Sequence, residues 1–443
     1  MEVVSEIPSG LLTCKVDGEE TGILEFSPES LLVRLPSKLE EKTELEVFYY
    51  DFKNCTYRSL KYPEVFWESV PTKKEEERFF KCYRTRTKDV QWQEMFSFVV
   101  QQYYHYILLK TKSVGNEFSK ELVGYPEEKD ETFDEDYFSW KARIQEELKG
   151  NHLIEAICQM DTELAISLEN PRSFQMFLDE KLEENMPAGL FEKAERLYIG
   201  NPFCHHLFPE KQQLYQILEK AYERNWKVTL HFTYVRESWR AETEKIVNEV
   251  YFWCRKKAFA LEMVVNDWGM FELLWGKEDY ITPVLGTLLN KRRKDPRYQY
   301  KKSSKEQKQL FMETPFEYKE YTDFLQKCGV RRLEFESGGY EVVLPKQKEQ
   351  GENFGISMHL PLYQTNTSQY CPLYALCTTQ ERGRQKEVKV CPKFCEQYAY
   401  IYAKHLHMAG RYNSIIAADV NISKEELEQY QKQGMDRIVW NFL

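Results

Sequence analysis

Apolar and polar residues alternate along most of the first 115 positions. The runs GLLTCKV, TGILEFSPESLLVRL, ELEVFYYDF and MFSFVVQQYYHYILLKTKS are separated by breaks that contain Gly, Asp and Pro. A period of two with turn residues at the breaks is typical of short antiparallel strands. We therefore predict a small β-barrel or sandwich as an N-terminal domain over residues 1–115.

An acidic segment, YPEEKDETFDEDYFSWKARIQEELKG, follows this β-rich part. Its latter half and the sequence through about residue 190 have the spacing of apolar residues that is typical of helices. The sequence predicts a mainly helical connector over residues 116–192.

Strand-like and helix-like segments then alternate to the end of the chain. RLYIGNPF precedes EKQQLYQILEKAYERNW, and KVTLHFTYV precedes RAETEKIVNEVYFWCRKKA. This alternation indicates a parallel sheet with crossover helices. Over residues 193–443 it predicts an α/β fold, a (β/α) barrel of the TIM type. A doubly wound sheet is the alternative, but no G-x-G-x-x-G follows the first predicted strand, and P-loop, H-E-x-x-H and G-x-S-x-G motifs are absent as well.

Four of the eleven cysteines, Cys371, Cys377, Cys391 and Cys395, gather near the C-terminus, and Cys204 directly follows the first predicted barrel strand. The βα loops of a barrel meet at one face, and closure brings the last strands beside the first, so Cys204 can join three of the others. Thiolates select iron–sulfur clusters or zinc, and zinc sites typically use two C-x2-4-C pairs. Only Cys391 and Cys395 have that spacing. Buried cysteines without a ligand and a thiol redox site remain alternatives.

The cellular compartment decides which cysteine chemistry is expected. No basic segment followed by an apolar core opens the sequence, and no run of about 18 apolar residues occurs in it. We therefore expect a cytoplasmic protein with no membrane partner. In a reducing cytosol, clustered cysteines are more often a metal or redox site than a disulfide framework.

The net charge of the chain limits the kinds of partner that it can bind. A charge of -10 and a pI near 5.6 argue against a general nucleic-acid coat. One local stretch, NKRRKDPRYQYKKSSKEQK, has nine Lys or Arg against two acids. Lys291, Arg292 and Arg293 are therefore candidate contacts to a polyanionic substrate such as RNA, although a solvated loop has the same composition.

Several polar residues lie where barrel strands are predicted to end. Asn266 and Asp267 close the strand FALEMVVND, where they suit either an Asx turn or a contact with substrate. His231 and His359 lie on predicted strands, so each is either a catalytic group or a hydrogen-bonded core residue. No nucleophile, base and orienting group stand out as a set, and we assign no catalytic residue.

His205 and His206 follow Cys204 directly. Such neighbours can tune a metal site or supply protons to it, whereas adjacent histidines in a loop can also be merely exposed.

Four of these segments, in this order, carry a resemblance to a known family. LYIGNPFC, EMVVNDWG, VLGTLLNKRRKDPR and a cysteine-rich tail followed by DRIV resemble the collagenase-like peptidases of unassigned family 32 over roughly residues 195–443. Members of that family include proteins that hydroxylate RNA bases and accessory proteins of anaerobic ubiquinone hydroxylation.

The resemblance implies a [4Fe-4S] cluster as cofactor, held by Cys204, Cys371, Cys391 and Cys395. Cys377 is the alternative to Cys371, and zinc is the alternative cofactor. The implied activity is oxygen-independent hydroxylation, or a related modification, of an RNA base or an aromatic small molecule. The alternatives are a peptidase, as the family name suggests, and a non-catalytic iron–sulfur accessory or scaffold protein.

The N-terminal part resembles a PilZ-like domain of the kind that binds cyclic di-GMP. Its segment ILEFSPESLLVRL departs from the family turn, because Glu25 replaces Asp or Asn, Ser30 stands at the Gly position, and no Arg-x-x-x-Arg precedes it. We expect a degenerate domain that contacts a protein partner, since arginine forks that hold phosphates are missing.

Overall fold

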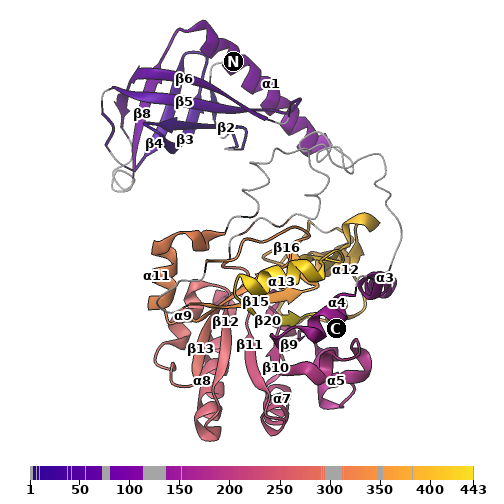
Figure 1. Cartoon of the computed structure of the whole chain (residues 1–443). Coiled ribbons are helices and arrows are strands. Elements are labelled where there is room, and N and C mark those ends of the chain that lie inside the picture. The colour runs from indigo at the N-terminus through magenta and orange to yellow at the C-terminus, as the bar shows by residue number, and fades with distance from the viewer. Residues whose placement is uncertain are drawn as a thin grey trace. The chain divides into compact units, whose positions relative to one another are not determined.

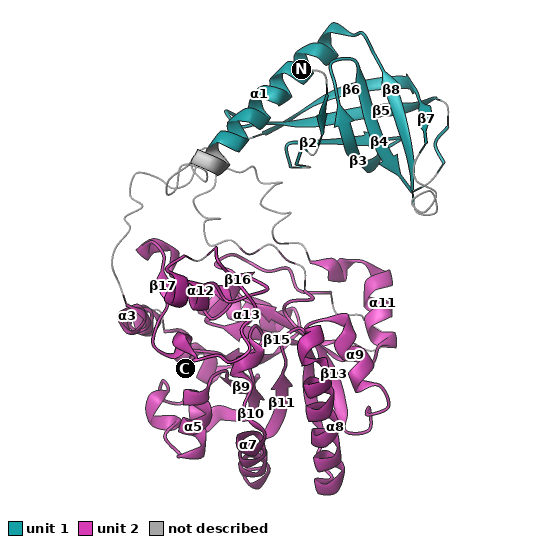
Figure 2. Ribbon diagram, turned by 180° about the vertical axis from the view of Figure 1, so that it is seen from behind, with its two compact units in different colours: residues 1–129, 300–303 teal, residues 130–299, 304–443 magenta. Residues whose placement is uncertain are grey.

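The protein is seen here as a computed structural model (Figure 1). It describes residues 3–5, 7–8, 10–36, 38–40, 42–54, 56–71, 80–112, 136–150, 152–290, 292, 294, 312, 314–346, 353–381 and 383–442. Two compact units divide the chain, one ending at residue 129 and the other holding the described residues from 136 onward (Figure 2).

The N-terminal unit is built on an eight-stranded antiparallel sheet. Its strand order is β6-β5-β2-β3-β4-β8-β7, and β1 pairs with β3. The strands are β1 (Val4–Ser5), β2 (Leu12–Val16), β3 (Glu19–Phe26), β4 (Ser30–Leu35), β5 (Lys42–Asp51), β6 (Thr56–Phe66), β7 (Glu68–Val70) and β8 (Lys81–Arg86). The predicted β-rich character of this part is confirmed.

The last segment of this unit is helical, contrary to the strand predicted for MFSFVVQQYYHYILLKTKS. Helix α1 (Val90–Lys112) presents Trp92, Met95, Phe96 and Val99 to the apolar core of the sheet. These positions have the spacing of one helix face. The aromatic and β-branched residues of the segment suggested a strand, but the core selects residues at helical intervals.

The second unit contains a closed barrel of eight parallel strands in the order β10-β11-β12-β13-β14-β15-β20-β9. The strands are β9 (Glu163–Leu168), β10 (Ala194–Ile199), β11 (Lys227–His231), β12 (Leu261–Val265), β13 (Ile281–Leu285), β14 (Arg332–Glu336), β15 (Gly355–Leu360) and β20 (Met435–Trp440). The parallel barrel expected from the alternation of strands and helices is confirmed.

Strand β9 lies inside the segment 116–192, for which the sequence predicts a mainly helical connector. It pairs with β10 on one side and with β20 on the other, and so closes the barrel. All of its residues from Leu164 to Leu168 are buried. A parallel strand buried on both faces is a short continuous apolar run, which periodicity alone does not separate from a buried helix. The barrel therefore begins before residue 193.

Helices follow most strands on the outside of the barrel (Figure 1). They are α5 (Pro171–Leu178), α7 (Lys211–Glu223), α8 (Arg240–Lys257), α9 (Trp268–Leu274), α11 (Lys319–Lys327) and α13 (Lys424–Lys432). Helices α3 (Tyr137–Gly150) and α4 (Leu153–Gln159) precede β9, and α6 (Leu190–Lys193) lies between α5 and β10. Each long helix buries one face; α7, for example, buries Leu214, Ile217, Leu218 and Ala221.

A long insertion separates β15 from α13. It contains β16 (Leu362–Thr367), α12 (Pro372–Thr379), β17 (Tyr400–Ile401), β18 (Met408–Arg411) and β19 (Ser414–Ala418). The four strands form an antiparallel sheet in the order β16-β19-β18-β17. Because the insertion starts where β15 ends, it lies at the face of the barrel where the parallel strands have their carboxyl ends.

The inside of the barrel is filled with side chains. Near the amino ends of the strands, Arg437 donates to Glu163 at 2.7 Å and to Glu262 at 2.7 Å, and Arg196 donates to Glu163 at 3.0 Å. An apolar layer follows, made by Ala165, Tyr198, Val264, Val284 and Val439. This filling leaves only the carboxyl end of the barrel for a site. Within the described part of the chain, no helix combines the length and apolar character required to cross a membrane.

Candidate functional site

Two loops at the carboxyl end of the barrel carry the predicted cysteines. Cys204 follows β10, and its backbone N–H donates to the side chain of Asn201 at 2.9 Å. Cys371 caps helix α12: its sulfur accepts a hydrogen bond from the backbone N–H of Tyr374 at 3.3 Å. The same thiol donates to the backbone carbonyl of Tyr412 at 2.9 Å, which ties α12 to the sheet of the insertion.

Cys391 and Cys395 flank a left-handed residue, Lys393, with φ of 57°. This turn aims the backbone N–H of Lys393 at the sulfur of Cys391, at 3.4 Å. Cys395 is buried, and Arg411 of β18 donates to its carbonyl oxygen at 2.7 Å.

Burial is the main influence on the pKa of three of these thiols. Burial raises the pKa of Cys204 well above its usual range, and the thiols of Cys395, Cys371 and Cys391 raise it further. Burial also raises the pKa of Cys371 to about 11 and that of Cys395 to about 12. The charge of the exposed Cys377 is a minor further cause that raises the pKa of Cys371. A metal bound here must therefore displace protons from thiols that hold them firmly.

The spacing of the ligands around a metal differs between a single zinc ion and an iron–sulfur cluster. A tetrahedral zinc ion holds sulfurs at about 2.3 Å from the metal, hence about 3.8 Å from each other. Among the described residues, no three cysteine, histidine or carboxylate side chains are arranged closely enough to hold a single ion. Each cysteine in the described ranges is also free of disulfides. Backbone N–H groups already point at the sulfurs of Cys371 and Cys391, as hydrogen bonds to sulfur do around iron–sulfur clusters. Four cysteine thiols are the type of donor that iron–sulfur clusters use.

A small polar cavity, which we call the mouth chamber, lies beside these cysteines. It is lined by Glu169, Phe203, His231, Glu336, His359 and Tyr412, among others. Its free space of about 10 Å³ holds about one water molecule. Phe203 precedes Cys204, and the carbonyl of Tyr412 receives the thiol of Cys371, so the chamber and the cysteines share walls.

One histidine of the mouth chamber is a hydrogen-bonded core residue. His359 Nε2 lies 2.5 Å from Glu334, and Tyr198 donates to the same carboxylate at 2.8 Å. Burial by itself raises the pKa of Glu334, but the charge and hydrogen bond of His359 hold it at about 2. Burial likewise lowers the pKa of His359, and Glu334 raises it above its usual value. The two form a buried ion pair.

His231, the other histidine, is different. Its side chain is 1% exposed, and neither ring nitrogen has a hydrogen-bond partner among the described residues. Burial, followed by the charge of His359, lowers the pKa of His231 to about 3. The ring is therefore neutral at physiological pH, and one of its nitrogens is an unused proton acceptor.

Glu169, at the end of β9, completes the set. Burial raises the pKa of Glu169 to about 7, while the hydroxyl of Ser167 donates to its carboxyl at 2.9 Å. Glu336 instead is ion-paired with Lys294 and accepts the backbone N–H of Gln364 at 2.9 Å. A carboxyl that holds its proton and a neutral imidazole in one chamber can act as acid and base. Glu169 escaped sequence analysis because its strand was hidden in the predicted connector.

The other predicted substrate residues have structural partners. Asn266 donates to the carbonyl of Phe232 at 2.7 Å and accepts the N–H of Leu288 at 3.2 Å, which joins three neighbouring strand ends. Asp267 caps α9 by accepting the N–H of Met270 at 3.1 Å. The local cap made by Asp267 fits the turn interpretation, whereas Asn266 bridges strand ends; contact of either residue with a substrate stays a prediction.

The basic loop is described only in part. Arg292 donates to the carbonyl of Glu336 at 2.6 Å and lies over the ring of Tyr340, whereas Lys291 and Arg293 fall outside the described residues. Arg292 thus faces the protein.

In the N-terminal unit, the turn that resembles a PilZ-like domain is closed by its own side chains. Glu25 pairs with Arg84 at 2.7 Å, and the hydroxyls of Ser27 and Ser30 are 2.8 Å apart. Arg84 is thus engaged by a carboxylate.

Comparison with known proteins gives distant likenesses. No protein-family model matches the sequence, and no curated protein matches it. The U32 peptidase Mk0906 has a structure similar to 63% of this chain and 92% of its own, with 10% identity and a TM-score of 0.30. An uncharacterized protein of Legionella is similar over 24% of this chain and 96% of its own, with 9% identity and a TM-score of 0.18.

Proposed function

We propose that this protein binds an iron–sulfur cluster through Cys204, Cys371, Cys391 and Cys395. The proposed activity is oxygen-independent hydroxylation, or a related modification, of an aromatic small molecule or an RNA base. One observation supports the cofactor: the side chain of Asn413 donates to the carbonyl of Phe203 at 2.6 Å, and the thiol of Cys371 donates to the carbonyl of Tyr412 at 2.9 Å, so the loop of Cys204 lies next to the loop of Cys371. Soft thiolates in sets of four are the ligands of such clusters.

The mouth chamber supports a catalytic role for the protein. A cluster held beside it supplies electron transfer. Burial raises the pKa of Glu169 to about 7, so that its carboxyl is partly protonated at neutral pH. His231 offers an acceptor nitrogen that has no partner among the described residues, and the buried rings of Phe203 and Tyr412 exclude bulk water. The chamber has room for about one water molecule and not for a ring, so these groups would transfer protons to a substrate bound at its entrance.

Anaerobic purification tests the cofactor. We expect one [4Fe-4S] cluster per chain by iron and sulfide analysis, with the broad visible absorption of thiolate-ligated iron. Replacing any one of the four cysteines with alanine should abolish it. Cys377→Ala is the matched control and should keep the absorption. Zinc in place of iron, or loss of the cluster in Cys377→Ala, would contradict this ligand set.

The activity needs a separate test. Nucleosides from total RNA and small-molecule extracts are compared by mass spectrometry between cells with the wild-type gene, cells without it, and cells with Cys204→Ala. We expect one species heavier by a single oxygen atom to depend on the wild-type gene. Peptide cleavage by cluster-loaded protein would favour the peptidase alternative. No difference in either assay would indicate an accessory or scaffold role.

A further inference from the structure

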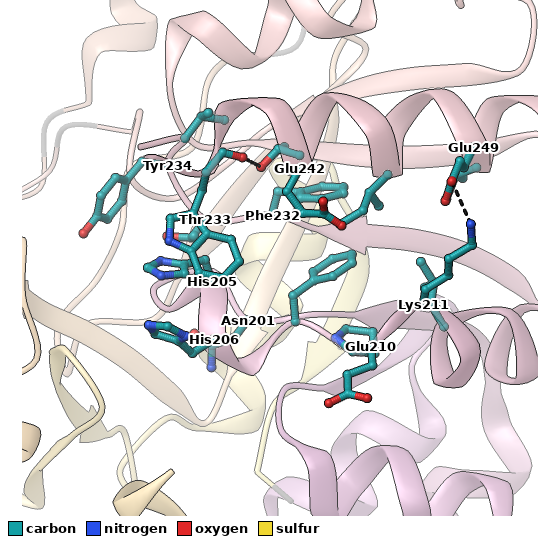
Figure 3. Close-up of a pocket in the computed structure, with 18 of the residues that line it drawn as sticks. Asn201, His205, His206, Glu210, Lys211, Phe232, Thr233, Tyr234, Glu242 and Glu249 are labelled. Carbon is teal, nitrogen blue, oxygen red and sulfur yellow. Dashed lines mark hydrogen bonds and ion pairs between the residues drawn. The ribbon is translucent and has the colours of Figure 1, made fainter. Parts of the chain in front are cut away.

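A second, larger cavity lies outside the barrel, between the first turns of α7 and the first half of α8. We call it the helix pocket; it is lined by His205, Phe208, Phe232, Thr233, Trp239 and Ile246, among others (Figure 3). Its volume is about 390 Å³. This size falls in the range of small-molecule sites, and the proposed function does not use it.

Aromatic side chains form part of its walls. The rings of Phe208 and Phe232 are stacked with centroids 4.5 Å apart and planes 20° apart. Trp239 packs against His205 with centroids 4.2 Å apart. Flat ring faces of this kind favour an aromatic ligand, which gains from offset or edge-to-face contacts in addition to burial.

Two buried polar groups in the same wall lack partners. Thr233 is 8% exposed, and its hydroxyl oxygen has no hydrogen-bond partner among the described residues. Both ring nitrogens of His205 are buried, and neither has a hydrogen-bond partner among the described residues. Buried polar groups are nearly always hydrogen-bonded, because leaving them unpaired costs free energy. A ligand with a donor and an acceptor would satisfy them.

Charges at the rim limit the ligand further. Glu210, Glu242 and Glu249 line the pocket together with Lys211 and Lys393. Lys211 is engaged by Glu249 at 2.7 Å, and Figure 3 shows this pair on the side opposite His205 and His206. The remaining side chains carry an excess of negative charge, which disfavours a phosphate or sulfonate.

We propose that the helix pocket binds an uncharged aromatic molecule that stacks against Phe232 and Trp239 and hydrogen-bonds to Thr233 and His205. The site is independent of the cofactor proposal, although it adjoins the cysteine loops. His205 follows Cys204, and Lys393 lies between Cys391 and Cys395.

Two fluorescent probes test the proposal. N-phenyl-1-naphthylamine is uncharged, and 8-anilinonaphthalene-1-sulfonate has the same rings with a sulfonate. We expect the uncharged probe to bind the full chain at one saturable site, and the sulfonate to bind about tenfold more weakly because of the acidic rim. Glu242→Gln removes one negative charge, so the affinities for the two probes should differ less in this variant. The uncharged probe is titrated into the protein before and after iron loading. Binding before loading supports the pocket whatever the outcome for the cofactor.

Tryptophan substitutions on α8 locate the probe. Thr243 lines the pocket, whereas its neighbour Glu244 is exposed. Thr243→Trp should fill the pocket and lower the affinity for the uncharged probe at least about tenfold, and the matched control Glu244→Trp should leave the affinity unchanged. Ile246→Trp is a second blocking variant, for use if Thr243→Trp does not fold. Equal binding by the blocked and control proteins, or equal affinity for both probes, would overturn the proposal.

Discussion

Replacing Glu169 with glutamine should stabilise the protein above neutral pH and change little near pH 4. Burial raises the pKa of Glu169 to about 7, from an ordinary value of 4.5. As the pH rises from 4.5 to 7, the unfolded chain loses this proton while the folded chain keeps it. The folded state therefore loses stability across that window, and the loss is complete above pH 7. Glutamine does not titrate, so the variant escapes the loss.

The magnitude follows from the shift. One pKa unit corresponds to about 1.36 kcal/mol, so a change from 4.5 to about 7 amounts to about 3 kcal/mol at pH 8. The hydrogen bond from Ser167 at 2.9 Å can be kept by the amide oxygen of glutamine. The new amide N–H₂ needs partners of its own, which reduces the gain to about 2 kcal/mol.

Urea titrations at pH 5 and pH 8 measure this difference. Tryptophan fluorescence is a suitable signal because seven of the nine tryptophans belong to the barrel unit. We expect the midpoint of Glu169→Gln to exceed that of the wild type at pH 8 and to be close to it at pH 5. An equal destabilisation at both pH values would mean that Glu169 is ionised in the folded chain, and its role as a proton donor would have to be abandoned.

Three further outcomes are expected. Glu334→Gln, unlike Glu169→Gln, should destabilise the barrel. We expect a loss of about 3–5 kcal/mol at pH 7 in the same urea assay, because the substitution leaves the charge of His359 buried and unpaired. A protein starting at residue 136 should fold by circular dichroism, whereas one starting at 192 should not, since it lacks β9 and opens the barrel. Gly286→Ala should lower the thermal midpoint, with a cost of about 2 kcal/mol, because a Cβ at this position would lie 2.1 Å from the side chain of Asn266; an unchanged midpoint would show that this contact relaxes.

The sequence predicted well those features that depend on repeated local patterns. Turn residues between alternating runs indicated the N-terminal sheet, and the succession of strands and helices indicated the parallel barrel. Cys204 was grouped with the C-terminal cysteines because closure of a barrel follows from its strand order. That these four cysteines bind one cofactor stays a prediction, which the cysteine variants test.

Local patterns were not sufficient for α1 and β9. In neither segment did the sequence pattern indicate the correct element. The aromatic residues of α1 are common in strands, and the buried residues of β9 form one continuous apolar run. Their conformations depend on which core they join, since packing routinely overrides intrinsic propensity.

The mouth chamber depends on tertiary structure even more strongly. Nothing near Glu169 in the sequence distinguishes it from other glutamates, and His231 and His359 have similar settings on their strands. Their chemistry differs because Glu334 hydrogen-bonds to His359, whereas no described residue hydrogen-bonds to the ring of His231. Residue type and strand order could be read along the chain, but proton affinity is set by burial and by charges that only folding brings near.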